Sequence, residues 1–196
     1  MKKILLINLL ILFSLSCKIS ADSTNSIKQI YEGNEKAKVT IITYESLTCS
    51  HCANFHEEIY PKLKKNFIDR GIAKIEFRSF PLDLAALNAS KISHCKNDGK
   101  SEILHFLFKN QKEWAKGNTV EEFNKNLKEV VNSQKFGIDF DKCINNKRIE
   151  DFVLEDRING MKKFNVNATP TIIINNKKFD KTLNYKNLKK TIEKLI

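Results

Sequence analysis

The feature that most constrains the fold is a pair of cysteines, Cys49 and Cys52, placed just after a β-branched, apolar run at residues 39–44. Val, Ile, Thr and Tyr are enriched in strands, so the run predicts a buried β-strand. From Cys52 onward apolar residues recur at three- and four-residue steps, and Gly71 closes the pattern, which predicts a helix over about residues 50–69. The cysteines are therefore expected where a strand ends and a helix begins.

The rest of the chain continues this alternation around one long helical stretch. Residues 73–80 alternate in polarity like a second strand, and the connection to it is long enough for a parallel crossover. Over residues 84–152 the apolar spacing is helical. Two apolar runs joined by Asn175-Asn176 predict a hairpin, and a final helix follows over residues 183–196. We expect an α/β sheet with a helical block inserted between its halves.

The N-terminus has the layout of a secretory signal peptide. Lys2 and Lys3 precede a mostly apolar run, residues 4–13, that fades into small residues ending at Ala21. The run is shorter than the roughly 20 apolar residues of a membrane-spanning helix, so we expect cleavage near Ala21 instead of a permanent anchor. A lipoprotein acylated at Cys17 is the alternative.

Four cysteines remain beyond this segment. An even number in an exported chain indicates disulfide chemistry, because the compartment is oxidising. Four cysteines allow three connectivities, of which the simplest joins Cys49 to Cys52 and Cys95 to Cys143. A bond between Cys95 and Cys143 would stabilise the fold by about 3–4 kcal/mol on the chain-entropy estimate. Two buried free thiols are the alternative for that second pair.

The net charge of +11 comes from lysines spread among Asn, Asp and Glu along the whole chain. No basic run is long or interleaved with aromatic residues, as a nucleic-acid site would require. We interpret the charge as a solvated basic surface and expect no nucleic-acid partner.

The placement of Cys49 predicts its chemistry. At the start of a helix its sulfur faces unpaired backbone N–H groups and the positive end of the helix dipole, both of which favour the thiolate. His51 can add a donor or a positive charge to the same sulfur. A cysteine stabilised in this way is a good leaving group, so a Cys49–Cys52 disulfide should be reactive and oxidising, with Cys52 as the more buried, resolving thiol.

Three other uses of the pair are weaker. A c-type haem needs His directly after the second cysteine, where this chain has Ala53. A zinc site could use Cys49, Cys52 and His56 with His94 or Cys95. However, the sequence has no second closely spaced Cys/His pair of the kind found in structural zinc sites. An inert structural disulfide is disfavoured because such short loops are strained. The histidines His56, His94 and His105 are interpreted as surface or satisfied, partly buried residues.

Three segments in order, "TYESLTCSHCANFHEEIYPKL", "FRSFPLD" and "NATPTIIINNKKF", resemble the DsbA-like branch of the thioredoxin superfamily over residues 33–196. The resemblance implies a thioredoxin-like fold with a helical insertion domain. We expect a signal peptide at 1–21, the first part of the thioredoxin-like domain at 22–83, the insertion at 84–157 and the second part at 158–196.

The same resemblance implies the roles of single residues. Cys49 would be the nucleophile, Cys52 its buried partner and His51 the thiolate-stabilising residue between them. Pro170 would be a cis-proline facing the disulfide, with Thr169 offering backbone pairing to a substrate. Taken alone, a proline at this position predicts only the first residue of a strand.

Two positions depart from the family pattern. The residue before His51 is Ser50, where the family often has proline, so the redox potential could differ. The family often carries an acid six positions before the first cysteine, which is Thr43 here. Glu45 lies two residues later and, by strand alternation, on the same face.

The sequence therefore predicts an exported, periplasmic thiol-disulfide oxidoreductase. We expect an oxidase that donates the Cys49–Cys52 disulfide to newly translocated, cysteine-containing proteins through a mixed disulfide. A reductase or isomerase with the same site, and a zinc-stabilised binding module, are the alternatives. The resemblance implies reoxidation by a membrane partner of the DsbB type; we expect a monomer with no bound cofactor and no metal.

Overall fold

The structure, a computed structural model, describes residues 26–196. The predicted signal peptide and Cys17 lie outside the described residues. The strands are β1 (Ile30–Gly33), β2 (Val39–Glu45), β3 (Ala73–Ser79), β4 (Thr171–Ile174) and β5 (Lys177–Lys178). The helices are α1 (Ser50–Asn54), α2 (Tyr60–Leu63), α3 (Leu84–Ser93), α4 (Glu102–Lys109), α5 (Gln111–Trp114), α6 (Val120–Asn132), α7 (Phe140–Ile144), α8 (Lys147–Phe164) and α9 (Tyr185–Glu193).

One five-stranded sheet, in the order β1-β3-β2-β4-β5, organises the chain. β2 and β3 pair in parallel, as the strand–helix–strand pattern predicts, whereas the other neighbours are antiparallel. β2 is central and almost wholly buried, because Val39 and Ile41 pack into the core on one face while Tyr44 packs on the other. The carboxyl end of this central strand delivers the chain to the cysteine pair.

The predicted helix over residues 50–69 is one continuous helical segment with two wide turns. It begins as α1, widens into a π-helical turn η2 (Phe55–Ile59), continues as α2 and widens again at η3 (Lys64–Ile68). Pro61 stands at the start of α2. Proline has no N–H to donate and its ring crowds the preceding turn, which accounts for the wide turn before it.

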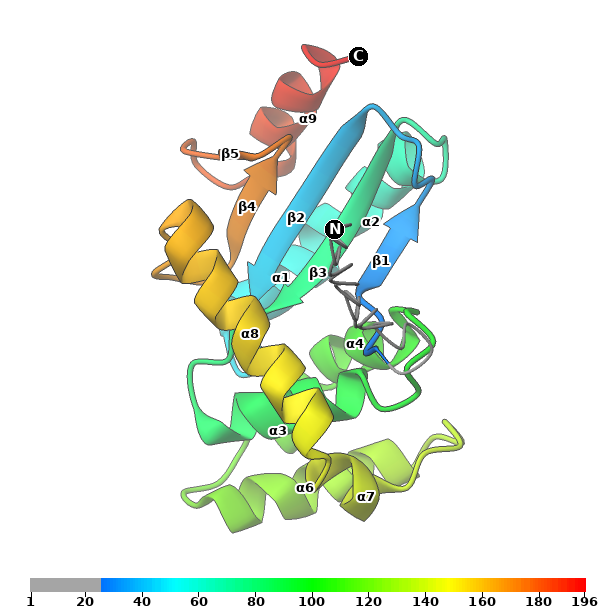
Figure 1. The fold of residues 1–196 in the computed structure, drawn as a ribbon, viewed down its shortest axis with the longest axis vertical. Helices are drawn as coiled ribbons and strands as arrows, with labels where there is room; N and C mark the ends of the chain where they lie inside the picture. The colour runs from blue at the N-terminus through cyan, green and yellow to red at the C-terminus, as the bar shows by residue number, and fades with distance from the viewer. Residues whose placement is uncertain (1–25) are drawn as a thin grey trace, which may run out of the picture.

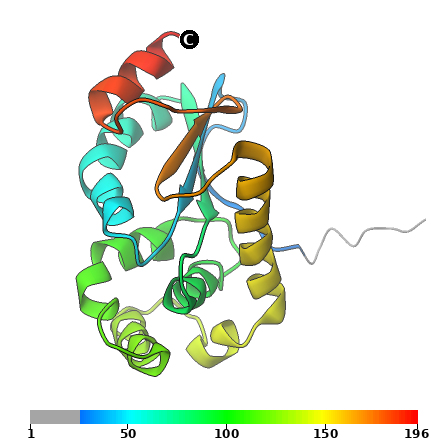
Figure 2. The same ribbon diagram turned by 90° about the vertical axis from the view of Figure 1, so that its left-hand side faces the viewer.

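Helices cover both faces of the sheet. Figure 2 shows the sheet on edge, with the helical segment from α1 to α2 and α9 on one face and α8 on the other. Figure 1 shows α3, α4, α6 and α7 gathered beyond one end of the strands, the end at which α1 begins. The helical block therefore lies next to the start of the helix that carries the cysteines.

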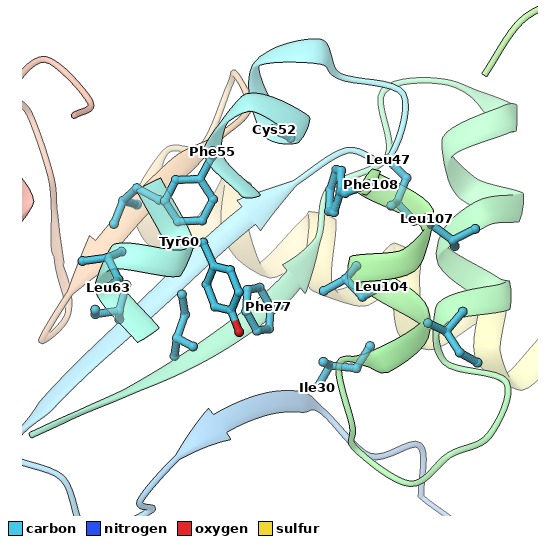
Figure 3. Close-up of a cluster of buried hydrophobic side chains, with 14 of the residues drawn as sticks. Ile30, Leu47, Cys52, Phe55, Tyr60, Leu63, Phe77, Leu104, Leu107 and Phe108 are labelled. Carbon is cyan, nitrogen blue, oxygen red and sulfur yellow. The ribbon is translucent and has the colours of Figure 1, made fainter. Parts of the chain in front are cut away.

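The larger hydrophobic core joins these parts. It includes side chains of the sheet, the first helical segment, the helical block and α9, and Figure 3 shows Phe55, Tyr60, Phe77 and Phe108 gathered below Cys52. Burial of such side chains is worth about 1.5–3 kcal/mol each. The core thus ties the helical block to the sheet at the place where the cysteine pair lies.

A smaller core holds α8 against the opposite face. Tyr44 packs edge-on to Phe80 with ring centroids 6.4 Å apart, and a Cβ built on Gly160 of α8 would lie 2.6 Å from the Tyr44 ring. Only glycine permits this approach. Beside it Arg78 donates to the buried carboxylate of Asp156 at 2.9 Å. Burial raises the pKa of Asp156, although Arg78 and the Ser79 N–H oppose that rise.

Some elements differ from their predicted extent. β1 has no counterpart in the sequence prediction, because four residues with a single buried side chain carry too little periodicity. The final helix is shorter than predicted: it starts at Tyr185, where Asn184 caps it. α8 runs continuously through residue 157, where a boundary was predicted, and the division of the chain into those parts stays a prediction. Within residues 26–196 every helix is too short or too polar to cross a membrane.

Candidate active site

The loop between β2 and α1 fixes Cys49 at the start of the helix. Cys49 is the N-cap residue of α1, with an extended backbone, and its N–H donates to Ser46 O at 3.0 Å. Thr48 Oγ1 donates to Asp83 at 2.7 Å, and the Leu82 N–H donates to Ser46 Oγ at 3.3 Å. The segment after β3 thus anchors the loop that presents the first cysteine.

The two thiols differ in exposure. Both are free, Cys49 is partly exposed, and Cys52 is completely buried. The thiol of Cys49 lies 3.4 Å from Thr169 O, to which it donates, and the Thr169–Pro170 peptide bond is cis. The structure therefore brings together Cys49, Cys52 and the predicted Thr169–Pro170 loop, which is 120 residues away in the sequence.

The surroundings of Cys49 favour its thiolate. A hydrogen bond from the Cys52 thiol contributes most to lowering the pKa of Cys49, to about 5, with further help from the side chain of Thr169 and the backbone N–H groups of Cys52 and His51. Burial acts in the opposite direction. A thiolate stabilised to this degree attacks poorly but leaves readily, which is the property of an oxidising disulfide.

Cys52 behaves in the opposite way. Burial raises the pKa of Cys52 far above its ordinary value, and the charges of Glu45 and Cys49 raise it further. Glu45, which adds to this rise in pKa, is itself only 4% exposed. Cys52 is therefore a thiol in the reduced protein and loses a proton when its sulfur forms a disulfide.

His51 lies at the exposed start of α1. It acts on Cys49 through its backbone N–H, which contributes to the lowered pKa of that thiol. The direct effect of its side chain stays a prediction.

Gln111 is a site residue that the sequence did not reveal. Its side-chain amide donates to Leu47 O at 2.7 Å and to Cys49 O at 3.0 Å, so α5 holds the cysteine loop from the side of the helical block. Gln111 is buried, so its amide N–H groups need acceptors within the protein, and these two carbonyls supply them. A lone glutamine within a helical pattern gives no signal of such a long-range contact.

The interpretation of the histidines was wrong for two of them. His56 is buried and contacts both Glu45 and His105 through its two ring nitrogens. His94 is completely buried, and that burial lowers its pKa to about 4. Sequence spacing alone could not place these residues, because their partners come from β2, β3 and the helical block.

The second cysteine pair lies in the helical block. Cys95, just after α3, and Cys143 of α7 form a disulfide with their Cα atoms 5.5 Å apart. Cys95 is thereby unavailable as a ligand of a zinc site with Cys49, Cys52 and His56. Within residues 26–196 no group of three metal-binding side chains converges on one point.

Comparison with known proteins gives the family. A family model described as Thioredoxin matches residues 25–194. The chain belongs to this thioredoxin family. Within it, the DsbA1 protein (α-DsbA1) of Wolbachia pipientis has a similar solved structure, with a TM-score of 0.73 and 29% identity, covering 85% of this chain and 90% of that one. BdbD of Bacillus subtilis gives a TM-score of 0.67 at 27% identity, covering 85% and 91% of the two chains. The resemblance to DsbA-like proteins is thus confirmed.

Two curated relatives of this chain are named for disulfide chemistry. Disulfide bond formation protein D of Bacillus subtilis is 27% identical over 83% of this chain and 74% of its own length. A provisionally named protein-disulfide oxidoreductase of Rickettsia conorii is 29% identical over 73% of this chain and 52% of its own length. The chain thus spans about half the length of the rickettsial relatives it matches.

Proposed function

We propose that this thioredoxin-family chain is an exported thiol-disulfide oxidoreductase that works as an oxidase. The observation that carries the proposal is the contrast within one helical turn: Cys49 is accessible with its pKa lowered to about 5, whereas Cys52 is buried with its pKa raised. A disulfide between such sulfurs favours its reduced form and therefore oxidises other thiols.

The reaction proceeds through a mixed disulfide. A substrate thiolate attacks Cys49, a sulfur–sulfur bond forms between them, and the Cys49–Cys52 bond breaks. Cys52 leaves with the electron pair and takes up a proton. A second substrate thiolate attacks the substrate sulfur of the mixed disulfide, so Cys49 leaves as a thiolate. Two electrons have then passed from the substrate to the protein.

The Thr169–Pro170 loop supplies the docking position for the substrate. Thr169 O lies 3.4 Å from the Cys49 sulfur and accepts its hydrogen bond. In the complex a backbone N–H of the substrate would donate to this oxygen instead. We infer that His51 adds a modest stabilisation of the thiolate from the exposed side. Clients are newly exported cysteine-containing proteins, and a membrane reoxidase of the DsbB type regenerates the disulfide of the monomer.

A reductase is the second candidate, because the same dithiol could run in reverse if its disulfide were stable. The two differ in the equilibrium of Cys49–Cys52 with glutathione, measured on residues 22–196 with the second disulfide followed separately by mass spectrometry. A potential near −120 mV, typical of strong oxidants, supports the oxidase. A potential near −270 mV, typical of thioredoxin, would make the chain a reductase.

A further inference from the structure

Four side chains from four separate elements form a continuous hydrogen-bonded chain beside the buried cysteine. Glu45 Oε2 of β2 lies 2.9 Å from His56 Nε2, the two Nδ1 atoms of His56 and His105 are 3.0 Å apart, and His105 Nε2 lies 2.8 Å from Glu32 Oε1 of β1. His56 belongs to η2 and His105 to α4. Each contact is within hydrogen-bond range.

The chain leads from the interior to the surface. Glu45 is 4% exposed, the His56 side chain 5% and the Glu32 side chain 15%, whereas the His105 side chain reaches 26%. Both imidazoles line a cavity of about 490 Å³ between the cysteine helix and the α4–α5 segment. A proton that reaches His105 therefore has access to solvent.

The neighbouring rings hold both imidazoles in place. His56 stacks on Phe108 with centroids 4.1 Å apart, and His105 stacks on Tyr60 at 4.5 Å. Figure 3 shows that Tyr60 and Phe108 approach from different helices, α2 and α4. Stacked rings do not turn freely, so a proton must move along fixed hydrogen bonds.

The far end of the chain is held as an anion. Tyr60 Oη donates to Glu32 at 2.6 Å, Ser101 Oγ also donates to it, and Lys64 Nζ lies 3.1 Å away. Burial alone would raise the pKa of Glu32, but the hydrogen bonds from His105 and these three groups hold it well below its ordinary value. Glu32 therefore fixes the proton on His105 Nε2.

Proton transfer along this chain needs only small shifts of protons within its hydrogen bonds. The three hydrogen bonds require three protons. In one arrangement Glu45 is protonated and donates to His56, which donates to His105, and both rings are neutral. If the Glu45 proton shifts to His56 Nε2, that ring becomes a cation. If the His56 Nδ1 proton then shifts to His105 Nδ1, the charge resides on His105, which releases its extra proton to water in the cavity. Glu45 is then left as a carboxylate. No bond other than N–H and O–H changes.

We propose that His56 and His105 form a proton relay between Glu45, beside Cys52, and the solvent-accessible cavity. The inference rests on the proposed function, since Cys52 takes up a proton when it leaves and loses one when it attacks. Glu45 Oε1 is buried and accepts no hydrogen bond from the described residues, so it is free to exchange that proton. His56 and His105 are positioning residues that act through Glu45.

The relay is tested on the step in which Cys52 attacks. Reduced protein is mixed with excess oxidised glutathione, so that Cys49 forms the mixed disulfide quickly and the attack of Cys52, which releases glutathione, limits the rate. Acid quenching and mass spectrometry follow the intermediate. We expect His105→Phe, which keeps an aromatic ring against Tyr60, to slow this step about 10-fold, within the range that positioned proton transfer contributes.

Three further readouts separate a relay from a structural role. The solvent-isotope proton inventory should be curved for the unmodified chain and linear for His105→Phe. Added imidazole should restore the rate of His105→Ala by entering the space left beside the cavity. Lys112→Met, which changes the lining of the same cavity, should leave the rate and the inventory unchanged.

An unchanged rate and inventory in His105→Phe would overturn the relay, as would an equal slowing in Lys112→Met. Slowing with a lower melting temperature, without imidazole rescue, would make His105 merely structural and would also overturn it. The attack of Cys52 can be measured whichever direction the protein works in. A low redox potential would therefore remove the oxidase proposal and leave the relay intact.

Discussion

The two cysteine pairs of this chain show how surroundings decide what a pair of sulfurs does. Cys49 and Cys52 lie within one helical turn, at an edge where one sulfur is accessible and the other buried. Cys95 and Cys143 are 48 residues apart and join α3 to α7 inside the helical block. The first pair is separated by only two residues of one helical turn, whereas the second closes a loop of 48 residues. The first is thus suited to exchange and the second to stability.

The largest difference is expected from removing one sulfur of the first pair. Cys49→Ser should lower disulfide transfer to a reduced peptide by about 10³-fold or more, because Cys49 is the accessible sulfur of the pair and Cys52 is buried. Its melting temperature should stay close to that of the reduced, unmodified chain. Transfer retained in Cys49→Ser would show that the proposed mechanism is wrong.

Removing the second pair should have the reverse effect. The double variant Cys95→Ala/Cys143→Ala should lose about 3–4 kcal/mol of unfolding free energy, since the unfolded chain regains the freedom of a 48-residue loop. Urea unfolding measures this loss. Disulfide transfer at a temperature where the variant is folded should change less than about 3-fold, which is below 1 kcal/mol. A large loss of disulfide transfer in the folded variant would show that the activity of Cys49 and Cys52 depends on the second disulfide.

The first pair should also be selectively reactive in acid. With a pKa of about 5, Cys49 is mostly thiolate at pH 6.5, whereas an unperturbed thiol with a pKa of about 8.5 is about 1% ionised there. Iodoacetamide should therefore alkylate Cys49 in the reduced protein with a midpoint near pH 5 and leave Cys52 unmodified. Alkylation of Cys49 with an ordinary thiol midpoint would contradict the geometry of the site.

The same shift has a consequence for stability. Because the fold lowers the pKa of Cys49, it stabilises the reduced protein fully above the pKa of the unfolded thiol. That contribution declines as the pH falls through about 5. His94, with its pKa lowered to about 4 by burial, adds a second acid-sensitive contribution, which is lost as the pH falls from about 6.5 towards 4.

The sequence predicted the parts of the site that local pattern encodes. The run at residues 39–44 and the helix after it place Cys49 and Cys52, and the family resemblance identified Thr169 and Pro170 as the facing loop. Gln111 and the histidine chain were not predicted. Their roles depend on contacts between elements 11 to 73 residues apart, for which spacing along one helix or strand carries no information.

Thr43 stands where the family often has an acid, and Glu45 of the same strand face lies two residues later. Thr43 is buried but donates only a long hydrogen bond of 3.5 Å to Glu76 O, whereas Glu45 lies close enough to Cys52 to raise its pKa. Strand alternation predicted that both would lie on one face, and a two-residue step along β2 brings the acid to the buried thiol. Alternation could not predict that His56 Nε2 would lie within hydrogen-bond distance of Glu45 Oε2.

The smallest effect is expected from His51, and it sharpens the contrast between backbone and side chain at Cys49. The His51 side chain is exposed, and the contribution seen in the structure comes from its N–H, which His51→Ser retains. We expect His51→Ser to raise the pKa of Cys49 by less than about 1 unit, corresponding to less than about 1.4 kcal/mol. Thiolate absorbance against pH measures the shift, with Ser50→Ala as the matched control on the neighbouring residue. A rise of several units would assign most of the stabilisation to the imidazole, and an absent rise would remove the His51 side chain from the site.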